Sequence, residues 1–261
     1  MATSTLSFAA RTDYAVDFSS CNVVAVDING DGKLDLAVSG GGYTNNVAIL
    51  LGNGNGTFQT PLSYAMGAGA QALSVADLNG DGKLDLVLVN TESAKISVAL
   101  GNGNGTFQSV MSYGTGAGPY SVAIADFNKD GKSDIVVANS GSNSVSILLG
   151  NGNGTFQGQA PFATGVNPST VQVADLNGDG NVDVVTTNYS SNTVSVLLGD
   201  GRGGFQAQVA YATASTPEGL AIADFNRDNK LDLVATNATY AGTNNVSVLL
   251  GKGDGTFQPN T

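Results

Sequence analysis

Acidic and amide side chains recur at alternating positions in five short stretches of the chain. The first stretch reads DINGDGKLD over residues 27–35, and similar stretches begin at residues 77, 126, 175 and 224. Each carries Asp, Asn, Asp and Asp at its positions 1, 3, 5 and 9. A tight loop can aim the oxygens of alternate residues at one point, and Ca²⁺ binds about six to eight oxygen ligands. The spacing therefore predicts one small cation site in each stretch, about five Ca²⁺ in all.

The same ligand set is expected in every stretch. Positions 1, 3 and 5 supply side-chain oxygens, position 7 supplies its backbone carbonyl, and position 9 supplies a carboxylate. Glycine at position 6 permits a left-handed turn, and Asn229, which replaces it in the last copy, is the next most tolerant residue. The predicted metal ligands are Asp27, Asn29, Asp31, Lys33 and Asp35; Asp77, Asn79, Asp81, Lys83 and Asp85; Asp126, Asn128, Asp130, Lys132 and Asp134; Asp175, Asn177, Asp179, Asn181 and Asp183; and Asp224, Asn226, Asp228, Lys230 and Asp232.

The charge of the chain agrees with local cation binding. The formal net charge is −11, and three Asp in each of five stretches account for 15 of the 21 acidic residues. Five divalent ions would add +10 and leave −1. An acidic chain of this kind is a poor candidate for binding nucleic acid.

The acidic stretches fit an EF-hand or a magnesium site less well than a calcium loop in a β-hairpin. An EF-hand requires Glu at position 12, where the five copies have Val38, Leu88, Val137, Thr186 and Ala235. Mg²⁺ demands a stiffer octahedral site and keeps its water. A hairpin of Asx turns without metal remains an alternative. Three carboxylates in each of five empty loops would repel one another, which favours calcium.

The stretches mark an internal repeat that fills residues 1–261 as one domain. They start at steps of 50 or 49 residues, and a second motif, GNGNGTF, follows at 52, 101 and 150, with variants at 199 and 251. In the third unit, β-rich runs cover residues 121–126, 134–139, 144–150 and 156–165, and no segment has a helical period. Four-stranded units of this length predict an all-β, five-bladed β-propeller.

The ends of the chain suggest how the ring closes. Four units carry a Phe followed six residues later by an aromatic residue, as in Phe58 and Tyr64, whereas the fifth unit ends near Phe257. Phe8 and Tyr14 have the same spacing. We therefore expect residues 6–16 to complete the last blade as its fourth strand. The alternative is a fragment of a larger propeller.

DINGDGKLDL followed by LLGNGNGTF resembles the FG-GAP repeat, also called the VCBS repeat, of integrin α-subunit propellers and of many secreted bacterial proteins. The resemblance covers essentially the whole chain, and the acidic stretch matches in all five copies. It implies a propeller that binds Ca²⁺ in the loop between the first two strands of each blade. Integrin propellers have seven blades, so an integrin-like ligand surface does not follow. Some fungal and bacterial lectins also resemble this repeat and bind sugars.

Catalysis has few candidate residues in this sequence. The absence of His rules out Ser–His and Cys–His nucleophile systems, and the single Cys21 forms no internal disulfide. GNGNG resembles a phosphate-binding loop, but no helix follows it. Asp17 and Glu218 are the remaining candidate acid–base pair, and solvated surface charge explains them better. We expect a protein that is not an enzyme.

Variation among the copies locates the candidate ligand surface. The acidic stretches are near-identical, whereas the equivalent positions Cys21, Gln71, Tyr120, Ser169 and Glu218 differ. Tyr43, Tyr120, Tyr189 and Tyr240 lie on or beside the same predicted face, opposite the acidic loops. Aromatic and amide side chains on a rigid scaffold suit a glycan or protein ligand. Neutral variation of exposed loops is an equal alternative.

The functional prediction is an extracellular binding or adhesion module with structural calcium. A glycan-binding, lectin-like propeller and a natural or engineered scaffold without a small ligand are the alternatives. Calcium affinities typical of extracellular modules favour an extracellular, periplasmic or cell-surface location. No run is apolar enough to span a membrane. The expected state is a monomer.

Overall fold

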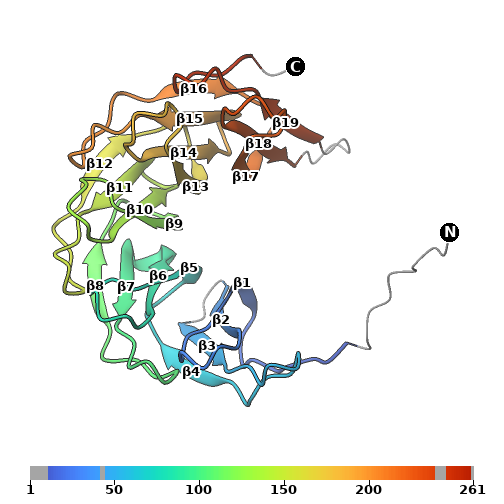
Figure 1. Ribbon diagram of the computed structural model, residues 1–261. Helices are drawn as coiled ribbons and strands as arrows, with labels where there is room; N and C mark the ends of the chain where they lie inside the picture. The colour runs from blue at the N-terminus through green and yellow to red at the C-terminus, as the bar shows by residue number, and fades with distance from the viewer. Residues whose placement is uncertain (1–10, 42–44, 239–244, 260–261) are drawn as a thin grey trace.

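The protein is an arc of antiparallel β-sheets, four of them four-stranded and one three-stranded (Figure 1). The computed structural model describes residues 11–41, 45–238 and 245–259. Each sheet is one repeat unit, so the sheets are numbered as blades one to five along the chain. Among the described residues, the helical content is one 3₁₀ turn, η1 (Thr91–Ser93). The expected all-β architecture of four-stranded repeats is thus confirmed for the first four blades.

The chain crosses each sheet in order from its first strand to its last. The first strands line the inside of the arc and the fourth strands its outside (Figure 1). First strands are β1 (Ser20–Val26), β5 (Ala70–Ala76), β9 (Pro119–Ala125), β13 (Pro168–Ala174) and β17 (Pro217–Ala223). Second strands are β2 (Asp35–Gly40), β6 (Asp85–Asn90), β10 (Asp134–Asn139), β14 (Asp183–Asn188) and β18 (Asp232–Asn237). Third strands are β3 (Asn46–Leu50), β7 (Lys95–Ala99), β11 (Ser144–Leu148), β15 (Thr193–Leu197) and β19 (Asn245–Leu249). Fourth strands are β4 (Leu62–Ala65), β8 (Met111–Gly114), β12 (Ala160–Ala163) and β16 (Val209–Ala212).

The register of each blade places its acidic stretch in the first hairpin. In blade three, Asp134 at the start of β10 pairs with Ala125 at the end of β9, so residues 126–133 form the connecting loop. β6, β10 and β14 are buried at every residue. A strand covered on both faces reads as a continuous run of small and apolar residues, which explains segments such as DIVVAN.

The hydrophobic core lies between neighbouring blades. Ile49 on β3 and Leu88 on β6 are fully buried in one cluster that joins blades one and two. Aromatic rings extend this contact outward, because the aromatic residue of each fourth strand meets the Phe of the next blade edge-on. The pairs are Tyr64–Phe107, Tyr113–Phe156, Phe162–Phe205 and Tyr211–Phe257, with ring centroids 5.2–5.4 Å apart. The two aromatic residues spaced six apart within a unit therefore each contact an aromatic residue of a neighbouring unit.

The arc is open, and the fourth strand expected for blade five is not observed among the described residues. Blade five contains β17, β18 and β19, and residues 11–16 form no strand. Tyr14 lies edge-on to Phe58 at 5.5 Å, and its hydroxyl accepts a hydrogen bond from the Phe58 amide at 2.9 Å. Tyr14 thus occupies the place that a preceding blade's fourth-strand aromatic takes elsewhere. Pairing with β19 would require the two ends of the arc to meet, and Figure 1 shows them apart. Phe8 and residues 6–10 lie outside the described residues.

Apolar side chains are exposed at both ends of the arc. Val23 in blade one is 59% exposed, and Phe225 in blade five is 49% exposed. Their equivalents inside the arc are covered by a neighbouring blade, as with Leu73 for Val23 and Leu78 for Phe225. Each end therefore presents one half of the interface that joins the blades. Within the part of the chain that is described, no helix is long and apolar enough to cross a membrane.

Candidate metal loops and candidate ligand pocket

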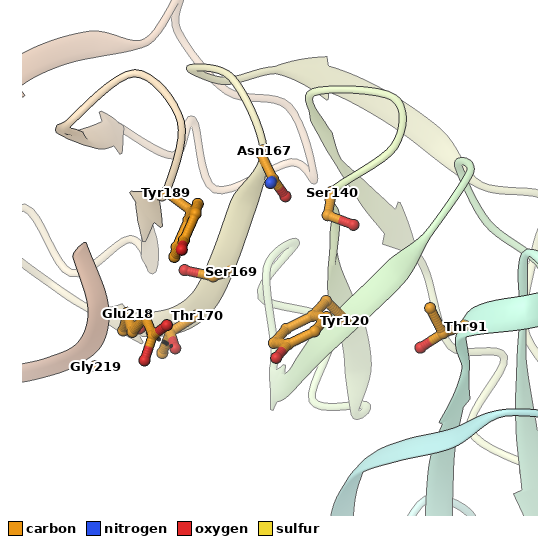
Figure 2. Close-up of a pocket in the computed structure, with 9 residues that line it drawn as sticks. All are labelled: Thr91, Tyr120, Ser140, Asn167, Ser169, Thr170, Tyr189, Glu218 and Gly219. Carbon is orange, nitrogen blue, oxygen red and sulfur yellow. Dashed lines mark hydrogen bonds between the residues drawn. The ribbon is translucent and has the colours of Figure 1, made fainter. Parts of the chain in front are cut away.

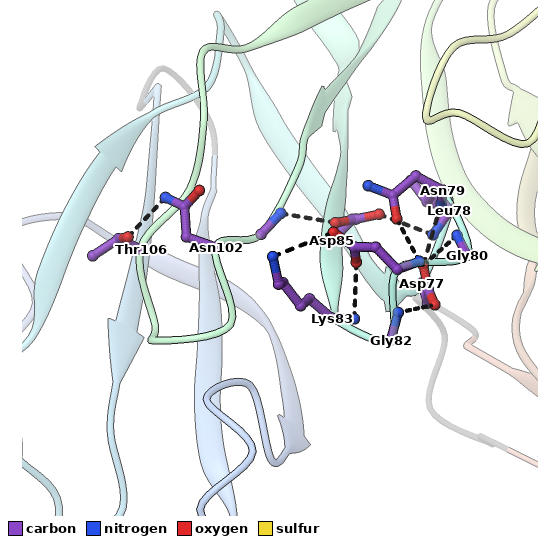
Figure 3. A network of polar contacts seen from close by, with 11 residues as sticks. Asp77, Leu78, Asn79, Gly80, Gly82, Lys83, Asp85, Asn102 and Thr106 are labelled. Carbon is purple, nitrogen blue, oxygen red and sulfur yellow. Dashed lines mark hydrogen bonds and ion pairs between the residues drawn. The ribbon is translucent and has the colours of Figure 1, made fainter.

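Each acidic loop is folded around its first aspartate. In blade two, Asp77 Oδ1 accepts a hydrogen bond from the Gly80 amide at 2.7 Å, and Asp77 Oδ2 accepts one from the Gly82 amide at 2.8 Å (Figure 3). Asn79 Oδ1 accepts the Asp81 amide at 2.9 Å, which is an Asx turn. The loop is therefore a compact hairpin with its polar side chains turned back onto their own backbone.

Left-handed backbone at two positions makes this hairpin possible. Gly82, at position 6, has φ of +79°, and Asn229 takes the same conformation in blade five at +65°. This confirms the expectation for position 6. Position 4 also has positive φ; it is glycine in three copies, whereas Lys129 at +59° and Arg227 at +64° adopt a conformation that their residue types do not favour. The amide of the following aspartate donates hydrogen bonds to the side chains at positions 1 and 3, which holds these residues in a conformation that costs non-glycine residues energy.

The ninth position of each stretch binds the loop to the glycine-rich turn. Asp85 is fully buried; its Oδ2 accepts the Leu78 amide at 2.9 Å and its Oδ1 accepts the Gly101 amide at 2.7 Å. Gly101 is the first glycine of GNGNG in blade two. The same two contacts recur at Asp35, Asp134, Asp183 and Asp232. The sequence pattern assigned this aspartate to metal alone and did not reveal its role in joining the two motifs.

Burial raises the pKa of Asp85, and the negative charges of Asp81 and Asp77 raise it further, against the opposing effect of its backbone hydrogen bonds. The pKa values of Asp134 and Asp183 are raised for the same reasons. None of the ion pairs among the described residues reaches a ninth-position aspartate. A buried carboxylate beside two more carboxylates favours a cation nearby.

The seventh position contributes a feature that the sequence pattern did not predict. Lys33, Lys83, Lys132 and Lys230 place Nζ 3.0–3.8 Å from the Oδ2 of the fifth-position aspartate. The hydrogen bond from the Lys33 side chain lowers the pKa of Asp31, and the backbone amide of Lys83 does the same for Asp81. These pairs are solvent-exposed and contribute little stability. The metal-binding role expected for the seventh-position carbonyl stays a prediction.

The donor chemistry of each loop suits a hard cation. All the predicted ligands lie among the described residues, and each loop gathers three carboxylates and one amide oxygen within nine residues. Within the described ranges, however, no three acidic side chains are already arranged to hold one metal ion. Their oxygens are hydrogen-bonded to the loop backbone instead. Metal binding is therefore a prediction that the donor set permits.

The opposite end of the blades carries a pocket of about 660 Å³ (Figure 2). This variable face comprises the turns between second and third strands and the starts of the first strands. Tyr120, Ser169, Tyr189 and Glu218, all selected from the sequence, line the pocket. Asp17 does not, so it is not joined there with Glu218 as an acid–base pair. Tyr43 and Tyr240 lie outside the described residues.

The equivalent first-strand positions approach one another around the inside of the arc. Gln71 Nε2 lies 3.3 Å from Cys21 Sγ. Burial raises the pKa of Tyr120, with smaller contributions from Cys21 and Glu218, while a hydrogen bond from Gln71 opposes the rise. Side chains at this position in four blades therefore lie close enough together to affect the pKa of Tyr120.

A family model described as the FG-GAP-like repeat matches residues 27–88, 77–137, 126–186 and 175–235 of this chain. The matches overlap and together extend from the first acidic stretch to the end of the fifth. None of the curated proteins compared with the sequence matches it.

Several solved structures share the fold at low sequence identity. An Agrocybe aegerita lectin, whose structure concerns recognition of non-reducing terminal N-acetylglucosamine, is 21% identical with a TM-score of 0.61, over 92% of this chain and 65% of the lectin. The V. cholerae biofilm matrix protein Bap1 is 22% identical with a TM-score of 0.56, over 94% of this chain and 39% of Bap1. A functionally unknown protein from Desulfotomaculum acetoxidans has a TM-score of 0.68 at 12% identity, over 93% of this chain and 69% of that protein. This chain thus spans less than two thirds of the lectin and of Bap1.

Proposed function

Because this chain belongs to the FG-GAP-like repeat family, we propose that it is a calcium-binding module that displays a ligand-binding face outside the cytosol. Each acidic loop holds one structural Ca²⁺ through the carboxylates at positions 1, 5 and 9 and the amide oxygen at position 3. The ion supplies positive charge that links the loop to the following strand. The protein's own contribution is to position these oxygens in a hairpin and bury one of them beneath the glycine-rich turn.

The buried ninth-position aspartate is the observation that carries the proposal. Asp85 is fully buried, has two negative neighbours and has no ion-pair partner among the described residues. Burying a carboxylate costs several kcal/mol unless it is compensated. Two backbone hydrogen bonds offset part of that cost, and a divalent cation shared with Asp77 and Asp81 would offset the remainder. The arrangement recurs in every blade, which argues for a structural role.

Calcium at 100 times its dissociation constant stabilises the folded state by about 2.7 kcal/mol for each site. We therefore expect calorimetry to count about five ions and expect EDTA to lower Tm sharply. Magnesium at equal concentration should restore much less stability. A Tm that is the same in calcium and in EDTA contradicts the proposal.

A glycan is the ligand that we propose for the variable face. Support comes from the pocket, which combines the exposed Tyr120 and the half-buried Tyr189 with hydroxyl and amide groups on strands and turns. The lectin neighbour supports the fold only. A glycan array in millimolar calcium tests the proposal, and an array on which no sugar binds favours the scaffold alternative. We propose binding rather than catalysis because the chain contains no histidine and its repeated carboxylates serve the loops.

We also propose that the five blades close into a monomeric ring in solution. Val23 and Phe225 carry the complementary halves of an interface that is formed four times inside the arc. Phe225→Asp should then destabilise the protein, whereas Val166→Asp, at a side chain of the same 49% exposure outside that interface, should not. Light scattering should give a monomer. Equal effects of the two substitutions, or a concentration-dependent oligomer, contradict closure.

A further inference from the structure

The pocket on the variable face is assembled from the inner ends of several blades. Tyr120 comes from β9, Ser169 and Thr170 from β13, and Glu218 from β17, while Thr91 and Ser140 come from turns of blades two and three. In Figure 2, Glu218 and Tyr120 stand on opposite sides of the opening. Because equivalent positions in other blades hold different residues, this combination occurs once among the described blades.

Within the described part of the chain, no cationic side chain that lines the pocket neutralises the negative charge of Glu218. Glu218 is exposed and has no ion-pair partner among the described residues, and no lysine or arginine lines the pocket. Its own backbone carbonyl, by contrast, is engaged by Thr170 and Thr187 hydroxyls at 2.6 and 3.1 Å. The backbone of Glu218 is thus fixed by β13 and β14, and its carboxylate is available to a ligand.

Three hydroxyl groups that line the pocket are placed to accept hydrogen bonds from a ligand. Thr91 Oγ1 donates to the Pro119 carbonyl at 2.8 Å, and Ser140 Oγ donates to the Gly118 carbonyl at 2.9 Å. Thr170 Oγ1 donates to the Glu218 carbonyl. A hydroxyl has one proton, so these three oxygens present only lone pairs to the pocket. The lining therefore favours a ligand that donates hydrogen bonds at several places.

Tyr120 adds a surface for a cation. Tyr120 is 42% exposed and lines the pocket, and burial raises its phenol pKa further above neutral pH, so the ring is uncharged. The face of a tyrosine ring attracts an ammonium group, and a neighbouring carboxylate strengthens the attraction. A cation that contacts both the Glu218 carboxylate and the face of the Tyr120 ring is therefore attracted by both groups.

We propose that this pocket binds an unacetylated amino sugar, with its ammonium group between Glu218 and Tyr120 and its hydroxyl groups donating to Thr91, Ser140 and Thr170. This inference rests on the proposed glycan-binding role and specifies its ligand class. An N-acetylated sugar lacks the positive charge, and an acidic sugar would be repelled by Glu218. A simple polyamine carries the positive charge but has no sugar hydroxyl groups to place at Thr91, Ser140 and Thr170.

The test compares ligands that differ in one group. Glucosamine tetramer and its fully N-acetylated form are titrated into the full chain in millimolar calcium by calorimetry. We expect the unacetylated tetramer to bind at least about tenfold more tightly, because a charge-assisted hydrogen bond is lost on acetylation. Glu218→Gln should weaken binding by about tenfold or more, by the same reasoning. Tyr120→Phe should keep most of the affinity, and Tyr120→Ala should lose it.

A matched control separates a specific site from general attraction to an acidic protein. Glu92→Gln removes the same charge from η1, on the same face, but Glu92 does not line the pocket, so this variant should bind normally. The melting temperature of each variant reports its folding.

Each contrary outcome overturns the inference in a recognisable way. Equal binding of the acetylated tetramer, equal losses in Glu92→Gln and Glu218→Gln, or equal binding of spermidine contradicts an amino-sugar site. Array binding of neutral glycans without glucosamine contradicts the inference and leaves the glycan-binding proposal standing. An array blank for all glycans contradicts both.

Discussion

The two faces of the arc contrast in how closely their blades agree. On the acidic-loop face, formed by the first hairpins and the glycine-rich turns, the ninth-position aspartate makes the same two backbone contacts in all five blades. On the variable face, five equivalent first-strand positions hold Cys21, Gln71, Tyr120, Ser169 and Glu218. The acidic-loop face repeats one structure in every blade, whereas the variable face carries a different side chain at the equivalent position of each blade.

Physical constraint explains this difference. A side chain at Gly101 would collide with the carbonyl oxygen of Leu84, and Gly103 and Gly105 have positive φ. Residues on the acidic-loop face therefore have few acceptable replacements. Many variable-face side chains, including Glu218, are exposed, so their identity has little effect on folding. Stability should depend on the first face and ligand specificity on the second.

The loss of a ninth-position carboxylate is expected to lower the free energy of unfolding more than any other substitution proposed for the two faces. Asp85→Ala leaves the Leu78 and Gly101 amides buried without acceptors, which should lower the free energy of unfolding by about 3 kcal/mol in EDTA. Urea unfolding in EDTA measures this fall in the free energy of unfolding. In saturating calcium the loss should be larger, because the site in blade two is also weakened. Equal losses in both conditions would show that Asp85 has no part in calcium binding.

A smaller loss is expected from Gly101→Ala. The new methyl group meets the Leu84 backbone, which cannot move without disturbing the hairpin, so stability should fall by about 1–3 kcal/mol. Gly114→Ala is the matched control, because a Cβ at Gly114 in β8 meets nothing within 4 Å. Thermal melts of the two variants should therefore differ clearly. Similar melts would mean that the close approach at Gly101 is not maintained in solution.

The pH dependence of stability tests how the charge of the ninth-position aspartate affects the acidic-loop face. The pKa of Asp85 is raised in the folded state above its ordinary value of 3.8, so the folded state binds that proton more tightly than the unfolded state. Its contribution to stability is greatest below pH 3.8 and is lost as pH rises through the raised pKa.

Metal-depleted protein should therefore lose stability relative to Asp85→Asn as pH rises through this window, as measured by urea unfolding. Bound calcium should reverse the trend, because it favours the ionised carboxylate. A difference between the two proteins that does not change with pH would refute the raised pKa.

The smallest effects are expected on the variable face. Glu218→Gln and Tyr120→Phe should change the free energy of unfolding by less than about 0.5 kcal/mol, because both residues are exposed. Differential scanning calorimetry measures this. A loss comparable to that of Asp85→Ala would show that the variable face also holds the fold together.

Much of the fold could be predicted because it is local and repeated. Turn residues, β-rich runs and a period of about 49 residues specify four strands and two hairpins per unit. The expected left-handed backbone at Gly82 and Asn229 is present for the same reason. The partners of the aromatic residues were not predictable from spacing, since Tyr64 contacts Phe107 in the next blade rather than Phe58 in its own.

The sequence by itself determined the all-β repeat, the position of every acidic loop and the division into a uniform and a variable face, because hydrogen bonds within nine residues and strand alternation are local. Tertiary structure alone decided that Asp85 accepts a hydrogen bond from the Gly101 amide, that Tyr14 accepts one from the Phe58 amide, and that side chains of separate blades line one pocket. These contacts join residues far apart in the chain, and their geometry depends on how one blade packs against the next.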